Sequence, residues 1–403
     1  MNALPMIDRP LHRQWLAQQV FDLVRFHRTG DGSGGFASLA MDGTALAGGR
    51  FQLHDVTRLV HCFALAKQLG IPGLDAQIDQ GMRFITSAHH DPSHGGYYWA
   101  VNTDGAVVSD KLAYGHAFVL LAASSALRVG HPMAQALLTD ITNVINTRFW
   151  DDTAGAVIDE FHADWSDISN YRGQNSNMHM TEALMAAFDV TGDRQYLIKA
   201  KRIADLIINR HARACGWRVA EHFTRDWAVD LTYEGDPMFR PAGTTPGHAL
   251  EWSRLLLQLW DLDGRTADWM VEASQGLFHT TTRDGWNADQ GGFHYTLDWH
   301  DQPLQTLRLW WPNAEAIGAA ALLWRMLGDT AALAWYDKVW DVVARSFIDT
   351  KHGGWFPELD AAGQPTEIIF KGKPDLYHAF QACLIPLLPA GVHLSSNLCG
   401  ALA

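Results

Sequence analysis

The sequence predicts an all-α protein, an (α/α)6 barrel of about twelve helices joined by short β-hairpin loops. One observation is a glycine turn that recurs between paired apolar-periodic segments, in QLGIPG, RVGHPM, VTGDRQ, DLDGRT and MLGDTA. Another is a series of loops in which aromatic residues follow a glycine pair, in GGFASLAMDG, GGYYWAVNTDG, GGFHYTLDWHDQP and GGWFPELDAAGQP. A period near 60 residues with two helices per unit is typical of a repeat architecture.

The apolar periodicity places each helix of the predicted ring. Alternating aromatics before Asp-Gly or an equivalent predict a hairpin in each loop, and AGAVIDEF and CGWRVAEHF complete a set of six loops. Six helical hairpins close into a ring with the even-numbered helices inside, in a single domain over residues 1–403. An open solenoid would need polar capping repeats, and neither end of the chain has that pattern. The helices are expected near residues 10–28, 52–69, 73–89, 110–128, 132–148, 174–190, 193–210, 246–262, 265–280, 312–327, 330–348 and 374–388.

Composition and charge exclude several classes of partner. The 403 residues are 47% hydrophobic, with a net charge of −13 and no basic cluster, which argues against nucleic acid and anionic lipid. No apolar run is long enough to span a membrane, and the first residues do not resemble a signal peptide, so a cytoplasmic protein is expected. Cys62, Cys215, Cys383 and Cys399 lack metal or redox spacing and are expected to be free buried thiols. The 17 tryptophans fit either sugar platforms or a large helical core.

Unusual polar residues gather at the starts of the even-numbered helices. If these helices form the inner ring, their N-termini open at one mouth, where the polar groups converge. A lone histidine on an apolar helix is usually a satisfied core or surface group. Buried polar groups are costly unless they are paired, however, so six repeats of the pattern indicate a site. The residues are His54, Arg58, Tyr114, His116, Asn175, Asn177, His179, Glu182, His248, Glu251, Trp311, Glu315, Asp375, Tyr377 and His378.

The stretch GTTPGHALEWSRL contains the start of one such helix. Thr245 suits the N-cap and Pro246 the first helical position, and His248 and Glu251 lie one turn apart on the same face. A helix N-terminus disfavours the imidazolium form, so His248 is expected to be neutral and able to accept a proton. Glu251 is expected to orient the other ring nitrogen of His248.

Motifs for most other chemistries are missing. The sequence has no GxxxxGK[ST] phosphate loop, no strand-linked GxGxxG, no HExxH and no nucleophilic Ser or Cys with a matched base. Two His-x-x-Glu pairs, His179/Glu182 and His248/Glu251, leave a metal open on spacing alone. General acid–base chemistry by histidine is the remaining interpretation.

Four long motifs resemble the N-acylglucosamine 2-epimerase superfamily over nearly the whole chain. They are YRGQNSNMHMTEAL, GTTPGHALEWSRLLL, RLWWPNAEAIGAA and GKPDLYHAFQACLIP, and they are most similar to the aldose–ketose isomerase branch. The resemblance implies an (α/α)6 barrel without a metal or a redox cofactor, in which two histidines pass a proton through a cis-enediol. It places these histidines at His248 and His378, and substrate-binding groups at Arg58, Tyr114, Asn177, His179, Glu251, Trp311 and Glu315.

The branch determines the expected reaction and its alternatives. Interconversion of D-mannose and D-fructose is expected, with D-lyxose and D-xylulose as a further pair, and the partner is a monosaccharide. In isomerases of sulfoquinovose the loop resembles GKQD; here Pro374 replaces the glutamine and offers no donor to a sulfonate. A 2-epimerase on the same scaffold is the first alternative, and a sulfoquinovose isomerase is another. An (α/α)6 glycoside hydrolase would need two carboxylates across the scissile bond, and a non-catalytic sugar-binding module does not explain the paired histidines.

Overall fold

The computed structural model describes residues 4–28, 34–46 and 48–400, and within them twelve α-helices follow one another along the chain. The predicted helix count is therefore confirmed, and most predicted bounds agree within a few residues. The helices are α1 Pro10–His27, α2 Leu53–Gln68, α3 Asp75–Phe84, α4 Ala113–Arg128, α5 Ala134–Val144, α6 Gln174–Thr191, α7 Arg194–Ala204, α8 Pro246–Leu262, α9 Trp269–Asp284, α10 Trp310–Leu327, α11 Thr330–Val342 and α12 Tyr377–Leu384.

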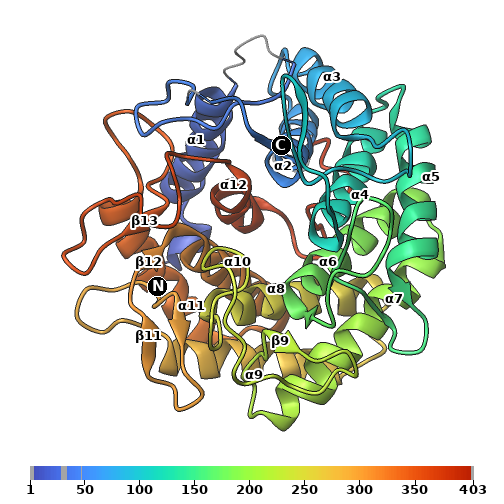
Figure 1. Cartoon of the computed structure of the whole chain (residues 1–403). Helices are drawn as coiled ribbons and strands as arrows, with labels where there is room; N and C mark the ends of the chain where they lie inside the picture. Colours follow the sequence, from blue (N-terminus) through green and yellow to red (C-terminus); the bar gives the residue numbers. More distant parts are fainter. Residues whose placement is uncertain (1–3, 29–33, 47, 401–403) are drawn as a thin grey trace.

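The even-numbered helices form the inner ring of the barrel, as predicted. Each packs against the next even-numbered helix, and α12 packs back against α2, which closes the ring. The odd-numbered helices lie around them (Figure 1). The fold class predicted from the sequence, an (α/α)6 barrel, is confirmed.

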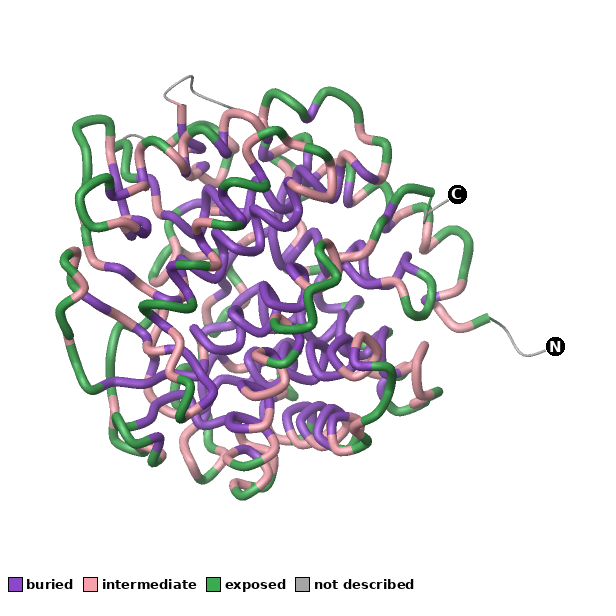
Figure 2. Tube along the Cα trace, turned by 90° about the vertical axis from the view of Figure 1, so that its right-hand side faces the viewer, coloured by how far each residue is buried: buried purple, intermediate pink, exposed green. Residues whose placement is uncertain are grey.

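Burial separates the two rings. Every residue of α2 except Lys67 is buried, whereas α3 buries only Ile78, Gly81 and Met82. Figure 2 shows the buried residues gathered through the middle of the molecule, with exposed loops around them. An inner helix has a neighbour on every side, so its sequence is apolar all round, and any polar residue in it needs a partner inside the protein.

Short strands connect the loops around one end of the ring. The residues just before an inner helix pair with the loop of the next repeat: β1 (Phe51–Gln52) with β2 (Ala100–Asn102), β4 (Lys111–Leu112) with β7 (Glu160–Phe161), β8 (Arg172–Gly173) with β9 (His222–Phe223), and β12 (Arg308–Leu309) with β13 (Glu358–Leu359). Single bridges Thr244–Leu297 and Leu39–Lys373 complete six links, the last between the first and the last repeat. These links hold the starts of the inner helices in register.

The predicted hairpins are therefore only part of the loop structure. Strand pairing within one loop does occur, between β2 and β3 (Gly105–Val108), β5 (Trp150–Asp151) and β6 (Ala156–Val157), and β10 (Thr296–Leu297) and β11 (Pro303–Gln305). The links between repeats were not predicted, because a pattern within one loop carries no information about the neighbouring loop.

The outer helices have one further feature, and one expectation about the cysteines is corrected. The outer helices α3, α5, α7 and α11 end in wider π-helical turns, at Ile85–His89, Ile145–Phe149, Asp205–Ala212 and Val343–Phe347. All four cysteines are free, but only Cys62 and Cys383 are buried; Cys215 is half-buried and Cys399 is exposed. Among the described residues, no helix is both long and apolar enough to cross a membrane.

Candidate active site

The inner helices open onto one cavity of about 680 Å³, at the end of the ring where the strands link the loops. Residues from the starts of all six helices line it, tryptophans in the case of α10 and polar groups in the other five, so the predicted convergence is present in the structure. Loop residues Met238, Phe239 and Phe370 complete the wall. The predicted residues that reach the cavity are His54, Arg58, Tyr114, Asn175, His179, His248, Glu251, Trp311, Pro374, Asp375 and His378.

His248 is held by a carboxylate from a neighbouring loop. Its Nδ1 lies 2.9 Å from both carboxylate oxygens of Glu221, just before β9. The same carboxylate accepts from the Thr245 backbone N–H at 3.1 Å and from Gln174 Nε2 at 2.8 Å. Since a carboxylate accepts, Nδ1 carries a proton, and in the neutral form of the imidazole Nε2 is the proton acceptor. The expectation that Glu251 orients His248 is wrong: Glu221 does so.

The helix start that carries His248 matches the sequence expectation. Thr245 is the N-cap residue of α8 and Pro246 occupies the first helical position. The Thr245 side chain makes no capping bond to the described residues; instead, its backbone N–H is satisfied by Glu221. Anchoring both groups on one carboxylate fixes the imidazole relative to the helix start.

His378 is held in the same way from the opposite side. Its Nδ1 lies 2.8 Å from Glu315 Oε1, and Glu315 Oε2 accepts from Arg254 Nε at 2.7 Å. Burial lowers the pKa of His378, although Glu315 opposes the shift, so the neutral imidazole is favoured. Each of the two histidines therefore has a carboxylate on Nδ1.

Trp311 connects the two histidines. Its ring centroid lies 5.0 Å from that of His248 and 5.7 Å from that of His378. A Cβ at Gly247 would overlap the Trp311 indole, so this position requires glycine for a close approach rather than for an unusual backbone angle. The indole thereby fixes the relative placement of the two rings.

Arg58 has partners within the protein. Its Nη1 donates to Asp375 Oδ2 at 2.9 Å, its Nη2 donates to the Tyr114 hydroxyl at 2.9 Å, and the guanidinium lies over the Phe118 ring at 4.4 Å. Burial opposes the charged form, but Tyr114 and Asp375 outweigh it and raise the pKa of Arg58. The Arg58 guanidinium at the cavity wall is thus oriented by two hydrogen bonds, one donated by each Nη, in a forked geometry.

Replacing Arg58 by lysine is expected to lower kcat/KM for the sugar by about 10-fold to 100-fold although the charge is kept. One ammonium cannot reproduce the fork, and a hydrogen bond to a charged group contributes about 1.5–3 kcal/mol. Steady-state kinetics on Arg58→Lys checks this, with the exposed Arg283→Lys as the matched control. A variant that keeps more than half of the wild-type kcat/KM would contradict the role given to the fork.

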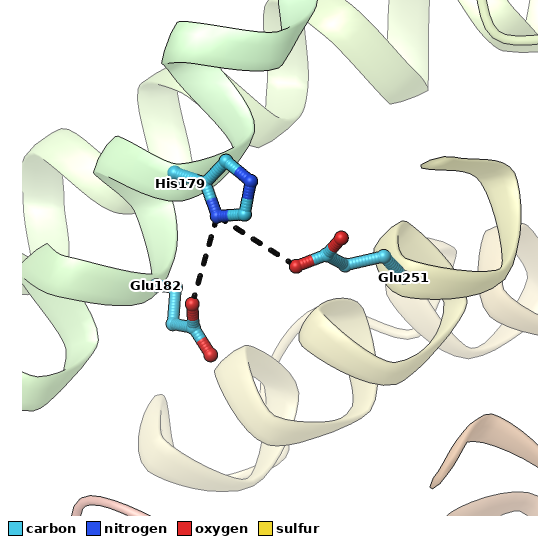
Figure 3. Close-up of side chains that lie close together, drawn as sticks. All are labelled: His179, Glu182 and Glu251. Atoms are coloured by element: carbon cyan, nitrogen blue, oxygen red, sulfur yellow. Dashed lines mark ion pairs between the residues drawn. The ribbon is translucent and has the colours of Figure 1, made fainter. Parts of the chain in front are cut away.

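A buried charge cluster lies beneath the cavity. The Arg254 guanidinium contacts Glu315 at 2.7 Å, Glu251 at 3.4 Å and Glu182 at 3.5 Å. His179 Nδ1 lies 3.7 Å from Glu251 and 3.8 Å from Glu182. Figure 3 shows His179 with the two carboxylates directed toward its ring. Burial lowers the pKa of His179 to about 3, which keeps this imidazole neutral. Three carboxylates therefore share one nearby cation.

The donors in this cluster do not suit a divalent ion. His179, Glu182 and Glu251 lie close enough together to be considered as ligands, as do Glu251, Glu315 and His378. All three carboxylates in these groups already contact the Arg254 guanidinium, and a metal ion would have to share them with a buried cation.

Treatment with EDTA followed by dialysis is therefore expected to leave kcat unchanged. Activity is measured before and after chelation, together with the metal content of the purified protein. Loss of activity on chelation and its return with one divalent ion would contradict the expectation and make the His-x-x-Glu residues the suspected ligands.

Asn177 is placed away from the cavity. Its side chain accepts from Val157 N at 2.8 Å and donates to Val157 O and Gly173 O, at 3.2 and 2.9 Å. Among the residues that the structure describes, Asn175 is the asparagine that lines the cavity. Residues two apart on a helix face nearly opposite sides, so only one of the pair can reach the site. The expected substrate contact of Asn177 is not supported by this geometry.

Other predicted residues lie behind the cavity wall. Glu315 acts on the cavity through His378, and the Tyr377 hydroxyl donates to Glu182. His116 accepts from the Tyr97 backbone N–H at 3.1 Å and is a core residue. These side chains support the residues that face the cavity.

Sequence reasoning missed Glu221 and Arg254. Arg254 had a usable signal, because it is a charged residue within the apolar helix ALEWSRLLL, the same feature that singled out Arg58. Glu221 had none: it lies in a loop, 27 residues before its partner His248.

Comparison with known proteins gives consistent matches. The family model for N-acylglucosamine 2-epimerase matches residues 34–382. D-Mannose isomerase of Pseudomonas cannabina pv. alisalensis is 44% identical, covering 97% of this chain and 96% of the relative; that of Thermobifida fusca is 42% identical over 98% of each. A crystal structure of a D-mannose isomerase superposes with a TM-score of 0.87 at 30% identity, covering 96% of this chain and 99% of that one.

Proposed function

Since the chain belongs to the N-acylglucosamine 2-epimerase family, we propose that it is an aldose–ketose isomerase that interconverts D-mannose and D-fructose. The observation that carries the proposal is a pair of cavity histidines, His248 and His378. Each is oriented by a carboxylate, and both pack against the Trp311 indole. Relatives at 42–44% identity over nearly their full length are D-mannose isomerases. A cytoplasmic location is part of the proposal and agrees with the four free cysteines.

The proposed reaction moves one proton between adjacent carbons of the open-chain sugar. One histidine, proposed as His378, takes the proton from C2 of mannose, and the C1–C2 enediol forms. The same imidazolium returns that proton to C1 of the enediol, which gives the ketose, while His248 serves ring opening and moves a second proton from O2 to O1. The two roles are exchangeable between the histidines on this geometry. Arg58 is proposed to stabilise the charge that develops on the enediol oxygens.

The product in deuterium oxide tests the proposal. Mannose incubated with the protein in D2O should give fructose with deuterium at C1, because the base exchanges its proton with solvent before returning it. Glucose with deuterium at C2, formed faster than fructose, would indicate the 2-epimerase alternative instead. A solved cellobiose 2-epimerase from Bacillus thermoamylovorans B4167 has a similar fold, with a TM-score of 0.82 at 20% identity.

The geometry disfavours a glycoside hydrolase. That chemistry needs two carboxylic groups facing each other across the scissile bond. Glu221 and Glu315 instead lie on the Nδ1 side of the two histidines. They orient the imidazoles and are not free to act on a glycosidic oxygen.

Mannose should be turned over with a higher kcat/KM than sulfoquinovose. Pro374 lines the cavity and has no donor, so a sulfonate at C6 would lose water without enough partners. A side-by-side comparison of mannose, glucose, lyxose and sulfoquinovose measures the ranking. If sulfoquinovose is preferred, the argument from Pro374 is wrong. Lys371, which also lines the cavity, is then the basic group to replace by methionine.

A further inference from the structure

Glu251 lies where negative charge exceeds positive charge. Its carboxylate is within 4.8 Å of ligand atoms on His179 and Glu182 on one side, and of Glu315 and His378 on the other. With all three glutamates ionised, Arg254 alone would balance three buried negative charges. When carboxylates share a buried site, protonating one of them relieves the repulsion.

The hydrogen bonds indicate which carboxylate takes the proton. Glu315 binds Arg254 at 2.7 Å and His378 at 2.8 Å, and Glu182 accepts from the Tyr377 hydroxyl. Among the described residues, the one hydrogen bond to Glu251 is a long one of 3.4 Å from Arg254 to Oε1, and His179 Nδ1 lies 3.7 Å from the same oxygen. Its Oε2 is buried and has no hydrogen-bond partner among the described residues. Protonating Glu251 therefore disrupts fewer hydrogen bonds than protonating Glu182 or Glu315 would.

The electrostatic balance agrees with this assignment. Burial, followed by the neighbouring Glu315 and Glu182 carboxylates, raises the pKa of Glu251 well above its ordinary value. Burial opposes ionisation of Glu315 too, but there Arg254 and His378 outweigh it and lower the pKa. Glu182 behaves like Glu315, since His179, Arg254 and Tyr377 together outweigh its burial and lower its pKa.

Every helix packed around Glu251 contributes to its surroundings. Helix α6 presents the neutral His179 and the ionised Glu182, α10 presents Glu315, and α12 presents Tyr377 and His378. The cations are Arg254 on α8 itself and Arg58 on α2. Arg58 is already paired with Asp375, so it does not supply the missing positive charge in full.

We propose that Glu251 is a neutral carboxylic acid in the resting protein, and that its unpartnered oxygen donates a hydrogen bond to an oxygen of the bound sugar. The donor role rests on the proposed function, whereas the protonation does not. Glu251 lines the cavity and is the least bonded of the three carboxylates. A neutral acid stabilises developing negative charge on the sugar by donation, which an ionised carboxylate beside it would oppose.

Infrared spectroscopy tests the protonation without any sugar. Protein labelled with ¹³C in the glutamate side-chain carboxyl is expected to show a carboxylic-acid C=O band above neutral pH, shifted from its unlabelled position. The label excludes Asp159, whose pKa burial raises to about 7. The band should disappear in Glu251→Gln and persist in Glu272→Gln, an exposed glutamate paired with Arg213. No such band in the wild type, or a band that persists in Glu251→Gln, overturns the proposal.

Kinetics test the donor role. Glutamine keeps an N–H donor and an oxygen for Arg254, whereas methionine of similar length has neither. Glu251→Met is expected to lose about 10²–10³-fold in kcat, as for removal of a transition-state donor, and Glu251→Gln should be at least tenfold more active than Glu251→Met. A glutamine variant no better than methionine overturns the donor role. A failure of the proposed function itself would instead appear in the wild type, as no conversion of mannose.

Discussion

Replacing either His248 or His378 by alanine is expected to lower kcat for mannose isomerisation by ~10²–10⁴-fold, the usual effect of removing a positioned acid–base group. Each imidazole has its Nδ1 on a buried carboxylate, Glu221 or Glu315, and both rings contact Trp311. No other histidine among the described residues has both features. Alanine can neither take nor return a proton, so each variant lacks one of the two acid–base groups that the proposed reaction uses.

Steady-state kinetics with mannose, and deuterium uptake at C1 of fructose, measure the effect in both variants. His162→Ala is the control, because the His162 side chain is exposed and lies 3.3 Å from the surface residue Asp110. Melting temperatures close to that of the wild type show that the loss is chemical. A variant that keeps more than about a tenth of the wild-type kcat removes that histidine from the mechanism.

Replacing Arg254 by methionine is expected to lower the free energy of unfolding by about 3–5 kcal/mol, the usual cost of removing one partner from a buried ion pair. Arg254 is fully buried and contacts Glu182, Glu251 and Glu315. Without it, ionised carboxylates remain in the core with no cation in direct contact. The methionine retains most of the side-chain volume, so the effect reports the lost charge rather than a cavity.

Urea unfolding followed by circular dichroism measures this change. Arg345→Met is the matched control: Arg345 forms an exposed pair with Asp341, one turn away on the surface, and such a replacement should change stability by less than about 0.5 kcal/mol. An Arg254→Met protein destabilised by less than about 1 kcal/mol would show that the cluster is neutralised by proton uptake and does not depend on the guanidinium.

Much of the site could be predicted because the inner helices are buried on all sides. A polar residue in such a helix is rare and conspicuous, so His54, Arg58, His179 and Asp375 could be selected from their apolar surroundings alone. The same criterion, a polar residue within an apolar helix, would also have selected Arg254. The proton-transfer roles of His248 and His378 were assigned from the family resemblance, since spacing within one helix does not distinguish a base from a core histidine.

The residues that were placed wrongly share one cause. Asn177 and Asn175 lie two apart at one helix start, and the sequence does not indicate which of them faces the cavity. Glu251 was expected to bind His248 because the two are one turn apart. Glu221, from the loop before β9, occupies that place instead, and Glu251 lies against His179 and Arg254. Proximity along a helix was a poor guide to contact across the ring.

The sequence by itself determined the ring of paired helices, its repeat and the end at which the polar groups gather. These follow from periodicity and from the cost of burying unpaired polar groups, which act within each segment. Only the tertiary structure decided which carboxylate serves which histidine, how Glu182, Glu251 and Glu315 share Arg254, and which glutamate is left to hold a proton. Those outcomes depend on distances of a few ångströms between side chains from different repeats, set when the strand links and the closing contact of α12 with α2 bring the helix starts together.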